Sequence, residues 1–218
     1  MKNFDIVIVG AGSAGCIVTN QIINNTNLKV LLIEAGPSDN HPVIQIPLGY
    51  GMTFFHKKMN WNFYSEKQKK LNDREVYYPR GKVIGGSGSI NAMIYARGLK
   101  TDFENWNLNK SWSWENIKDT YEKIEVPIKG KSKKIPINKI PVNDVSNEHH
   151  SILKNYFNAA NDFHFQFNHQ LNSSIEDQVG NYNVNIINGF RASSAKIFLK
   201  PIKNHPNLTI LTNTEVLK

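Results

Sequence analysis

The chain has 218 residues, of which 40% are hydrophobic, and a formal net charge of +8 at pH 7. A chain of this length can bury the core of a globular protein, and no apolar run approaches the roughly 20 residues of a transmembrane helix. The single cysteine, Cys16, excludes a disulfide framework and favours a small packing residue in a reducing, cytoplasmic compartment. We expect no signal peptide, because the first strand begins by Phe4.

Positive charge is densest in a stretch that contains prolines but no interleaved aromatic residues. Its lysines are Lys129, Lys131, Lys133 and Lys134. Without a nucleic-acid-binding signature, such a stretch favours a solvated loop over a nucleic-acid site. We therefore expect no nucleic-acid partner, whereas weak peripheral contact with acidic membrane lipids is compatible with the net charge.

The first elements in chain order form a strand, a glycine turn and a helix. Residues 4–9 are apolar and rich in β-branched side chains, which predicts a buried parallel strand. Residues 14–24 have helical spacing, and Gly10-Ala11-Gly12-Ser13-Ala14-Gly15 lies at the junction. In such a turn the first glycine allows a tight bend, the second lets a diphosphate approach the backbone, and the third lets the helix pack closely.

A second strand, residues 29–33, ends at Glu34, about twenty residues after the last glycine. A carboxylate at this place accepts hydrogen bonds from ribose hydroxyls and repels a 2'-phosphate, which favours FAD or NAD over NADP. The alternative is a chance glycine turn. The strand, the helix and Glu34 in register favour the dinucleotide interpretation.

A second glycine-rich stretch runs from Gly81 to Asn91. It resembles a flexible linker in composition, but the apolar residues between Ile90 and Tyr95 argue against a solvated segment. It is not a phosphate-binding P-loop, because no Gly-Lys-Ser/Thr is present.

The later elements are less distinctive. A helix is predicted from Trp112, with Ile117, Tyr121 and Ile124 on one face, and residues 126–150 are predicted to form a linker or lid loop. Another helix is predicted from Ser151, and strands are predicted over residues 182–187 and 208–211.

The seven histidines do not indicate a metal site. His149 and His150 are adjacent, but no cysteine or carboxylate recurs at ligand spacing. His164 and His169 lie in an aromatic segment where packing or an exposed loop explains them. We expect no metal.

Residues 78–98, Tyr-Pro-Arg-Gly-Lys-Val-Ile-Gly-Gly-Ser-Gly-Ser-Ile-Asn-Ala-Met-Ile-Tyr-Ala-Arg-Gly, closely resemble the first signature of the glucose-methanol-choline (GMC) oxidoreductases, particularly the choline-dehydrogenase-like branch. Further segments similar to that family are residues 60–66, 102–106, 113–114, 188–199 and 205–212. The resemblance therefore covers nearly the whole chain, with residues 126–150 as the exception.

The resemblance implies an α/β fold: a Rossmann-like FAD-binding domain of the GMC type with part of an α+β substrate-binding domain, in a truncated chain. Residues 1–125 would form the first segment of the FAD-binding domain and 126–150 a linker or lid loop. Residues 151–200 would belong to the substrate-binding domain, and 201–218 would return to the FAD-binding domain.

Fifteen residues are expected to bind FAD. Gly10, Gly12 and Gly15 would hold the pyrophosphate, Glu34 the ribose, Val83 and residues 91–94 the flavin, and the Val216 backbone the adenine. The full set is Gly10, Gly12, Ser13, Ala14, Gly15, Glu34, Ala35, Val83, Gly86, Ser87, Asn91, Ala92, Met93, Ile94 and Val216. Ile90 occupies the place where some family members attach FAD through a histidine, so we expect noncovalent FAD.

The expected function is FAD-dependent oxidation of the CH-OH group of a small alcohol, with hydride transfer to flavin N5 and a quinone or oxygen as the electron acceptor. Because family members are much longer, we expect the catalytic histidine beyond Lys218, and this chain alone to be inactive. The alternatives are a hydroxynitrile-lyase-like member with structural FAD and a catalytically inactive FAD-binding fragment.

Overall fold

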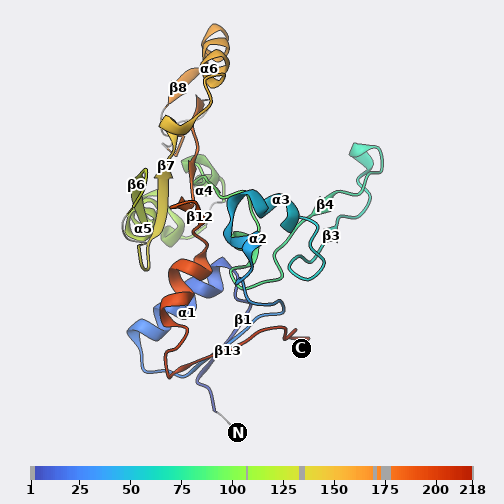
Figure 1. Cartoon of the computed structure of the whole chain (residues 1–218), viewed down its shortest axis with the longest axis vertical. Helices are drawn as coiled ribbons and strands as arrows, with labels where there is room; N and C mark the ends of the chain where they lie inside the picture. The colour runs from blue at the N-terminus through green and yellow to red at the C-terminus, as the bar shows by residue number, and fades with distance from the viewer. Residues whose placement is uncertain (1–2, 107, 133–135, 169–170, 173–177, 218) are drawn as a thin grey trace. The chain divides into compact units, whose positions relative to one another are not determined.

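The computed structural model describes residues 3–106, 108–132, 136–168, 171–172 and 178–217 (Figure 1). The chain forms two compact units: the first comprises residues 1–93 and 189–218, and the second comprises residues 94–188. No helix in these described ranges is long and apolar enough to cross a membrane. Two lysines of the basic stretch, Lys133 and Lys134, and one histidine, His169, lie outside the described residues.

The first unit is built on a parallel sheet of three strands in the order β1 (Ile6–Val9), β2 (Val30–Ile33) and β13 (Leu208–Leu211). The predicted strand, turn, helix and strand are confirmed, as is the strand at 208–211. Central β2 alternates buried and half-buried residues, but the prediction of a buried first strand is wrong: Val7 is 54% exposed, Val9 is 65% exposed, and its other two residues are half-buried. β1 lies at the edge of the sheet, so it pairs with one neighbour only.

Helix α1 (Ser13–Asn25) lies beside the helical segment that precedes β13, which consists of η6 (Ala195–Leu199) and η7 (Lys200–Ile202) (Figure 1). The Nδ2 of Asn20 donates to the Phe198 carbonyl at 2.8 Å, which joins the two across 178 positions of sequence. Cys16 is fully buried between them, and burial raises the pKa of its thiol to about 12. This agrees with the expected packing role.

The other elements of the first unit are short. They are α2 (Pro42–Gln45), α3 (Tyr50–Thr53), β3 (Phe63–Tyr64), β4 (Tyr77–Tyr78), β12 (Phe190–Arg191) and the 3₁₀ turns η1 (Pro47–Gly49), η2 (Lys69–Leu71) and η3 (Gly86–Ser89).

The second unit contains a four-stranded sheet in the order β5 (Ile94–Tyr95), β10 (Asn183–Val184), β7 (Ile140–Asp144) and β6 (Glu125–Lys129). The segment 126–150 is therefore not simply a linker or lid loop, since β6 and β7 pair in parallel within it. Three consecutive residues of β7 are buried, whereas β6 has no buried residue. Pro127 lacks a backbone N–H and lies in β6, at the edge of the sheet, where that donor is dispensable.

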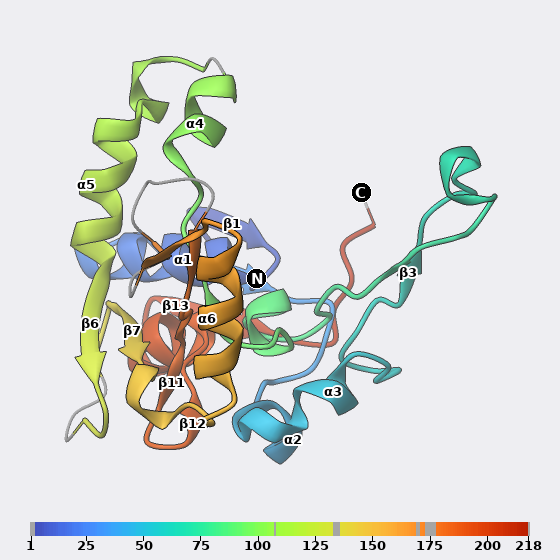
Figure 2. The ribbon, with the colours of Figure 1, turned by 90° about the horizontal axis from the view of Figure 1, so that it is seen from above.

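The helices predicted from Trp112 and from Ser151 are confirmed, whereas the first helix of the second unit was not predicted. Helices α4 (Lys100–Trp106) and α5 (Trp114–Ile124) lie side by side (Figure 2), and the rings of Phe103 and Trp114 are 5.9 Å apart. The remaining elements are α6 (Leu153–Asp162), η4 (Lys110–Trp112), η5 (Ser146–Glu148), β8 (Gln166–Asn168), β9 (Gln178–Gly180) and β11 (Ile186–Ile187).

A polar cluster anchors the start of the second unit to its sheet. The Arg97 guanidinium donates Nε to Glu125 at 2.9 Å, and the Tyr95 hydroxyl donates to the same carboxylate. Burial, followed by the hydrogen bond to Glu125, raises the pKa of Tyr95 above its usual range. The three side chains form one hydrogen-bonded network, in which Tyr95 and Arg97 both donate to the Glu125 carboxylate.

Candidate functional site

The turn between β1 and α1 has a geometry that explains its glycines. Gly10 has φ +94°, which favours glycine, and its N–H donates to the Ile33 carbonyl at 2.8 Å. A Cβ at Gly15 would lie 2.0 Å from the Gly10 oxygen, so only glycine lets α1 pack against the turn. A Cβ at Gly10 or Gly12 would meet nothing within 4 Å, so the outer surface of the turn is open.

The N-terminus of α1 faces this open surface with amides that have no intrahelical partner. Gly12 occupies the N-cap position, where no side chain caps the helix, and the first turn contains no acidic residue. An uncapped N-terminus of a 13-residue helix carries partial positive charge. An anionic group at this point would satisfy the amides and interact favourably with the helix dipole.

Glu34 ends β2 beside the turn, and two backbone amides hold its carboxylate. Ala11 N–H donates to Oε2 at 2.8 Å, and Gly36 N–H donates to Oε1 at 3.0 Å. These bonds fix the orientation of the buried side chain, and each carboxylate oxygen retains a second acceptor site. Thr214 N–H donates to the Glu34 carbonyl at 3.0 Å, which brings the segment after β13 to the same place.

The second glycine-rich stretch packs directly on the first. Gly85 N–H donates to the Ala11 carbonyl at 2.7 Å, and a Cβ at Gly86 would lie 2.8 Å from the Gly12 Cα. Gly86 also has φ +56°. The linker interpretation is thus excluded, because η3 is an ordered turn with Gly86 and Ser89 buried.

Together these segments surround a cavity of about 310 Å³, which we call the turn cavity. Six residues predicted to bind FAD line it: Gly10, Gly12, Glu34, Ala35, Gly86 and Val216. Six others were not predicted: Val9, Ile33, Trp61, Gly81, Thr214 and Glu215. Lys82 joins two of these, because its Nζ lies 4.0 Å above the Trp61 ring and 3.2 Å from the Glu215 carboxylate.

The other predicted residues lie outside the lining of the turn cavity. Ser13, Ala14 and Gly15 form the first turn of α1. Val83 is fully buried, in a cluster with Ile44, Met59 and Ile90. Ser87, Asn91, Ala92 and Met93 belong to η3 and the loop after it, and Ile94 begins the second unit.

The loop after η3 is held in an unusual conformation. Met93 has φ +61°, which is uncommon for a residue with a side chain, and it is buried. The Asn91 Oδ1 accepts from the Met93 N–H at 3.0 Å and from the Arg191 Nη1 at 2.7 Å. A rare backbone conformation that is held in place by surrounding hydrogen bonds is typical of ligand-contacting segments.

Arg191 is the functional candidate that the sequence did not reveal. Its guanidinium, 1% exposed, donates to the carbonyls of Ile44 at 2.8 Å and Gly88 at 3.2 Å as well as to Asn91. Burial lowers its pKa to about 10, so it remains charged at pH 7. Its Nη2 has no hydrogen-bond partner among the described residues. No local pattern marks Arg191, since its partners lie 100 or more positions away.

The described histidines act mainly in turns. A ring Nδ1 accepts a nearby backbone N–H in His41, His56, His150 and His205. In the described part of the chain, no group of three or more histidine, cysteine or acidic side chains is placed to hold a metal ion.

A sequence model described as GMC oxidoreductase matches residues 4–218. The alcohol dehydrogenase (acceptor) of Pseudomonas putida is 35% identical over 219 residues, which cover 99% of this chain and 40% of that protein. The chloroplastic fatty acid photodecarboxylase of Chlamydomonas reinhardtii is 32% identical over 220 residues, covering 100% of this chain and 36% of that protein. Oxygen-dependent choline dehydrogenases from several bacteria are 28% to 32% identical.

Among solved structures, pyridoxine 4-oxidase from Mesorbium loti superposes with a TM-score of 0.83 at 28% identity. The match covers 97% of this chain and 42% of that one. The chain thus spans about two fifths of the length of the proteins it matches.

Proposed function

The chain belongs to the GMC oxidoreductase family, whose members are FAD-dependent enzymes, and we propose that it supplies the FAD-binding part of an enzyme that oxidises the CH-OH group of a small alcohol. The observation that carries the proposal is the convergence on one cavity of the open glycine turn, the Glu34 carboxylate and the second glycine-rich stretch.

The residues of the turn cavity fit the diphosphate and ribose of FAD. The uncapped amides of α1 offer donors to a diphosphate, and the bare surface of Gly10 and Gly12 leaves room for it. The fixed carboxylate of Glu34 offers acceptors to ribose hydroxyls. We assign the backbone near Val216 to the adenine end, since it lines the same cavity.

We assign the loop from Asn91 to Ile94 to the flavin ring, in line with the resemblance of residues 78–98 to the family signature. When bound, FAD supplies an acceptor for the hydride that leaves the alcohol carbon. Arg191 holds this loop by its bond to Asn91, and it therefore acts as a positioning residue. The site also requires noncovalent FAD, because Ile90 has no nucleophilic atom and is buried with Ile44 and Val83.

The remaining parts of the reaction are assigned outside this chain. We propose that a histidine beyond Lys218 takes the hydroxyl proton, and that residues of the same downstream part select the alcohol. The electron acceptor is proposed to be a quinone or oxygen. The cytoplasmic location, with peripheral membrane contact, stays a proposal from the single cysteine and the positive net charge.

Measuring the flavin content of purified variants tests the cofactor assignment. We expect Glu34→Gln to weaken FAD binding at least tenfold, because its NH₂ group replaces one acceptor and opposes the N–H of Ala11 or Gly36, at a cost of about 1 to 3 kcal/mol. Glu34→Arg should abolish binding. The matched control is Glu66→Arg, which reverses the same charge at an exposed position and should bind FAD normally. Full flavin content in both Glu34 variants would contradict the assignment.

A second candidate function deserves a direct comparison, because one of the relatives is a photodecarboxylase. Anaerobic incubation with a panel of alcohols should bleach the flavin of an alcohol oxidoreductase in the dark. A carboxylate substrate that loses CO₂ only under illumination, with no bleaching by any alcohol, would favour the second function. Bleaching together with aldehyde formation would favour the first.

A further inference from the structure

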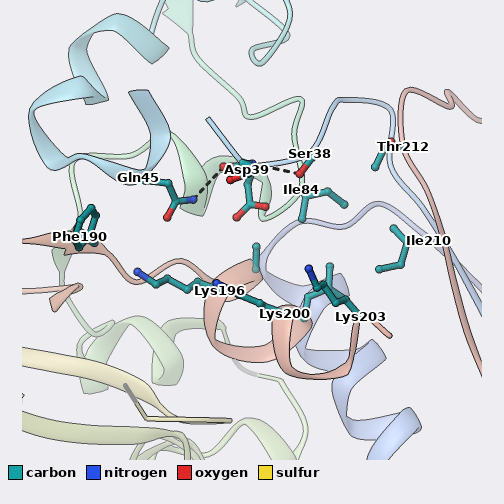
Figure 3. Close-up of a pocket in the computed structure, with 13 residues that line it drawn as sticks. Ser38, Asp39, Gln45, Ile84, Phe190, Lys196, Lys200, Lys203, Ile210 and Thr212 are labelled. Carbon is teal, nitrogen blue, oxygen red and sulfur yellow. Dashed lines mark hydrogen bonds between the residues drawn. The ribbon is translucent and has the colours of Figure 1, made fainter. Parts of the chain in front are cut away.

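A second cavity lined entirely by the first unit shares no residue with the turn cavity. Its volume is about 570 Å³, and it lies between residues 38–45, the η6–η7 segment and the end of β13. Ala35 lines the turn cavity and Ser38 lines this one, so the chain after β2 separates them. We call it the lysine cavity (Figure 3).

Three lysines and one carboxylate give the lysine cavity a positive charge. Lys196, Lys200 and Lys203 follow one another at spacings of four and three residues, which places them on one helical face, and Asp39 and Gln45 project from the opposite side (Figure 3). None of the ion pairs within 4 Å in the described part of the chain involves these lysines or Asp39. Two positive charges are therefore left unbalanced when Asp39 is ionised.

The electrostatic interactions show that these groups affect one another. Burial, and next the Lys200 charge, lowers the pKa of Lys196. Burial raises the pKa of Asp39 even though Lys200 and Lys196 act in the opposite direction. Like charges four residues apart on a helix are destabilising, and an anion between them would remove that cost.

The rest of the lining mixes apolar and polar side chains. Phe190, which is half exposed, Ile84 and Leu199 provide apolar surface. Ser38, Asn40 and Thr212 provide hydroxyl and amide groups. Such a combination fits an organic molecule with an apolar body and a charged end.

We propose that the lysine cavity binds a phosphate monoester with an apolar body, whose dianion lies among Lys196, Lys200 and Lys203. A dianion balances the two unpaired positive charges. Lysine ammonium groups bind phosphate as point charges, whereas a carboxylate is better matched by the planar fork of arginine, and no arginine lines this cavity. The phosphate belongs either to a soluble metabolite or to a phospholipid headgroup. The proposal does not depend on the identity of the oxidised alcohol.

Calorimetric titration of the FAD-loaded protein with phenyl phosphate tests the site. FAD fills the turn cavity, so its own diphosphate site does not compete. We expect phenyl phosphate to bind at least tenfold more tightly than benzoate, which has the same ring and a single charge. Lys200→Gln with Lys203→Gln should weaken binding at least tenfold. The matched control, Lys69→Gln with Lys70→Gln, removes the same charge from exposed η2 and should leave it unchanged.

A variant that binds phenyl phosphate more tightly cannot be explained by misfolding. Asp39→Asn removes the opposing carboxylate, and we expect it to tighten phenyl phosphate binding three- to tenfold. Absence of phenyl phosphate binding to the FAD-loaded protein, or equal binding by the Lys200/Lys203 variant, would overturn the proposal. So would an unchanged or weaker affinity after Asp39→Asn.

Vesicle sedimentation then distinguishes the two sources of phosphate. Binding to phosphatidic acid vesicles but not to phosphatidylcholine vesicles, lost in the Lys200/Lys203 variant, identifies a lipid headgroup. Binding of phenyl phosphate without sedimentation identifies a soluble phosphate monoester. Both results support the site. If a segment of the chain itself fills the cavity with a carboxylate, phenyl phosphate will not bind. That result would overturn the proposal.

Discussion

Gly12→Ala should separate ligand binding from folding at the turn cavity. A Cβ at this position meets no protein atom within 4 Å, and the backbone, with φ −69°, is accessible to alanine. Replacing glycine reduces the entropy of the unfolded chain, which stabilises by about 0.4 to 1 kcal/mol. Alanine is a poorer N-cap than glycine by a similar amount. We therefore expect the free energy of unfolding, measured without FAD, to change by less than about 1 kcal/mol.

The same methyl group lies where a diphosphate would approach the α1 amides. Displacing the diphosphate weakens charge-assisted hydrogen bonds that contribute about 1.5 to 3 kcal/mol each. A loss of about 2 kcal/mol corresponds to roughly a thirtyfold weaker FAD affinity. Quenching of flavin fluorescence measures this affinity, and urea unfolding of the FAD-free protein measures stability.

Gly51→Ala is the matched control, because its Cβ would also meet nothing within 4 Å while Gly51 lies in α3, away from the lining of the turn cavity. It should leave the FAD affinity unchanged and raise the free energy of unfolding by at most about 1 kcal/mol. An unchanged FAD affinity in Gly12→Ala, or a loss of more than about 2 kcal/mol of stability without FAD, would refute the reasoning.

Three more predictions follow from the same structure. Gly86→Ala forces φ +56° on a residue with a side chain and pushes a Cβ to 2.8 Å from Gly12, so urea unfolding should show a loss of at least about 1 to 2 kcal/mol; a loss below about 0.5 kcal/mol would count against this packing. Cys16, with its pKa raised to about 12 from 9.0, should resist iodoacetamide in the native protein and react in urea. Because the raised pKa favours the neutral thiol, its contribution to stability is complete below about pH 9 and is lost as the pH rises toward 12, and Cys16→Ala should remove that loss. With Ile90 unable to form a covalent bond, acid precipitation should leave the flavin in the supernatant; flavin retained in the washed pellet would contradict noncovalent binding.

The features that the sequence predicted well are local ones. The strand, turn and helix around Gly10 to Gly15 could be recognised because glycine conformation and apolar spacing act within a few residues. Glu34 could be placed at the end of the second strand by counting from the turn. The segment 126–150 was misjudged, because its short strands β6 and β7 are stabilised by their neighbours rather than by a strong pattern of their own.

From the sequence one can infer that a glycine turn meets a helix N-terminus and that a carboxylate follows at the end of the next strand. The groups that surround them are known only from the tertiary contacts. Arg191 reaches Ile44 across 147 positions, the two glycine stretches pack backbone to backbone, and Glu215 joins Lys82 at the turn cavity. Contacts of this kind depend on which elements the chain brings together, and hydrogen bonds and close packing between distant segments leave no periodic trace in the sequence.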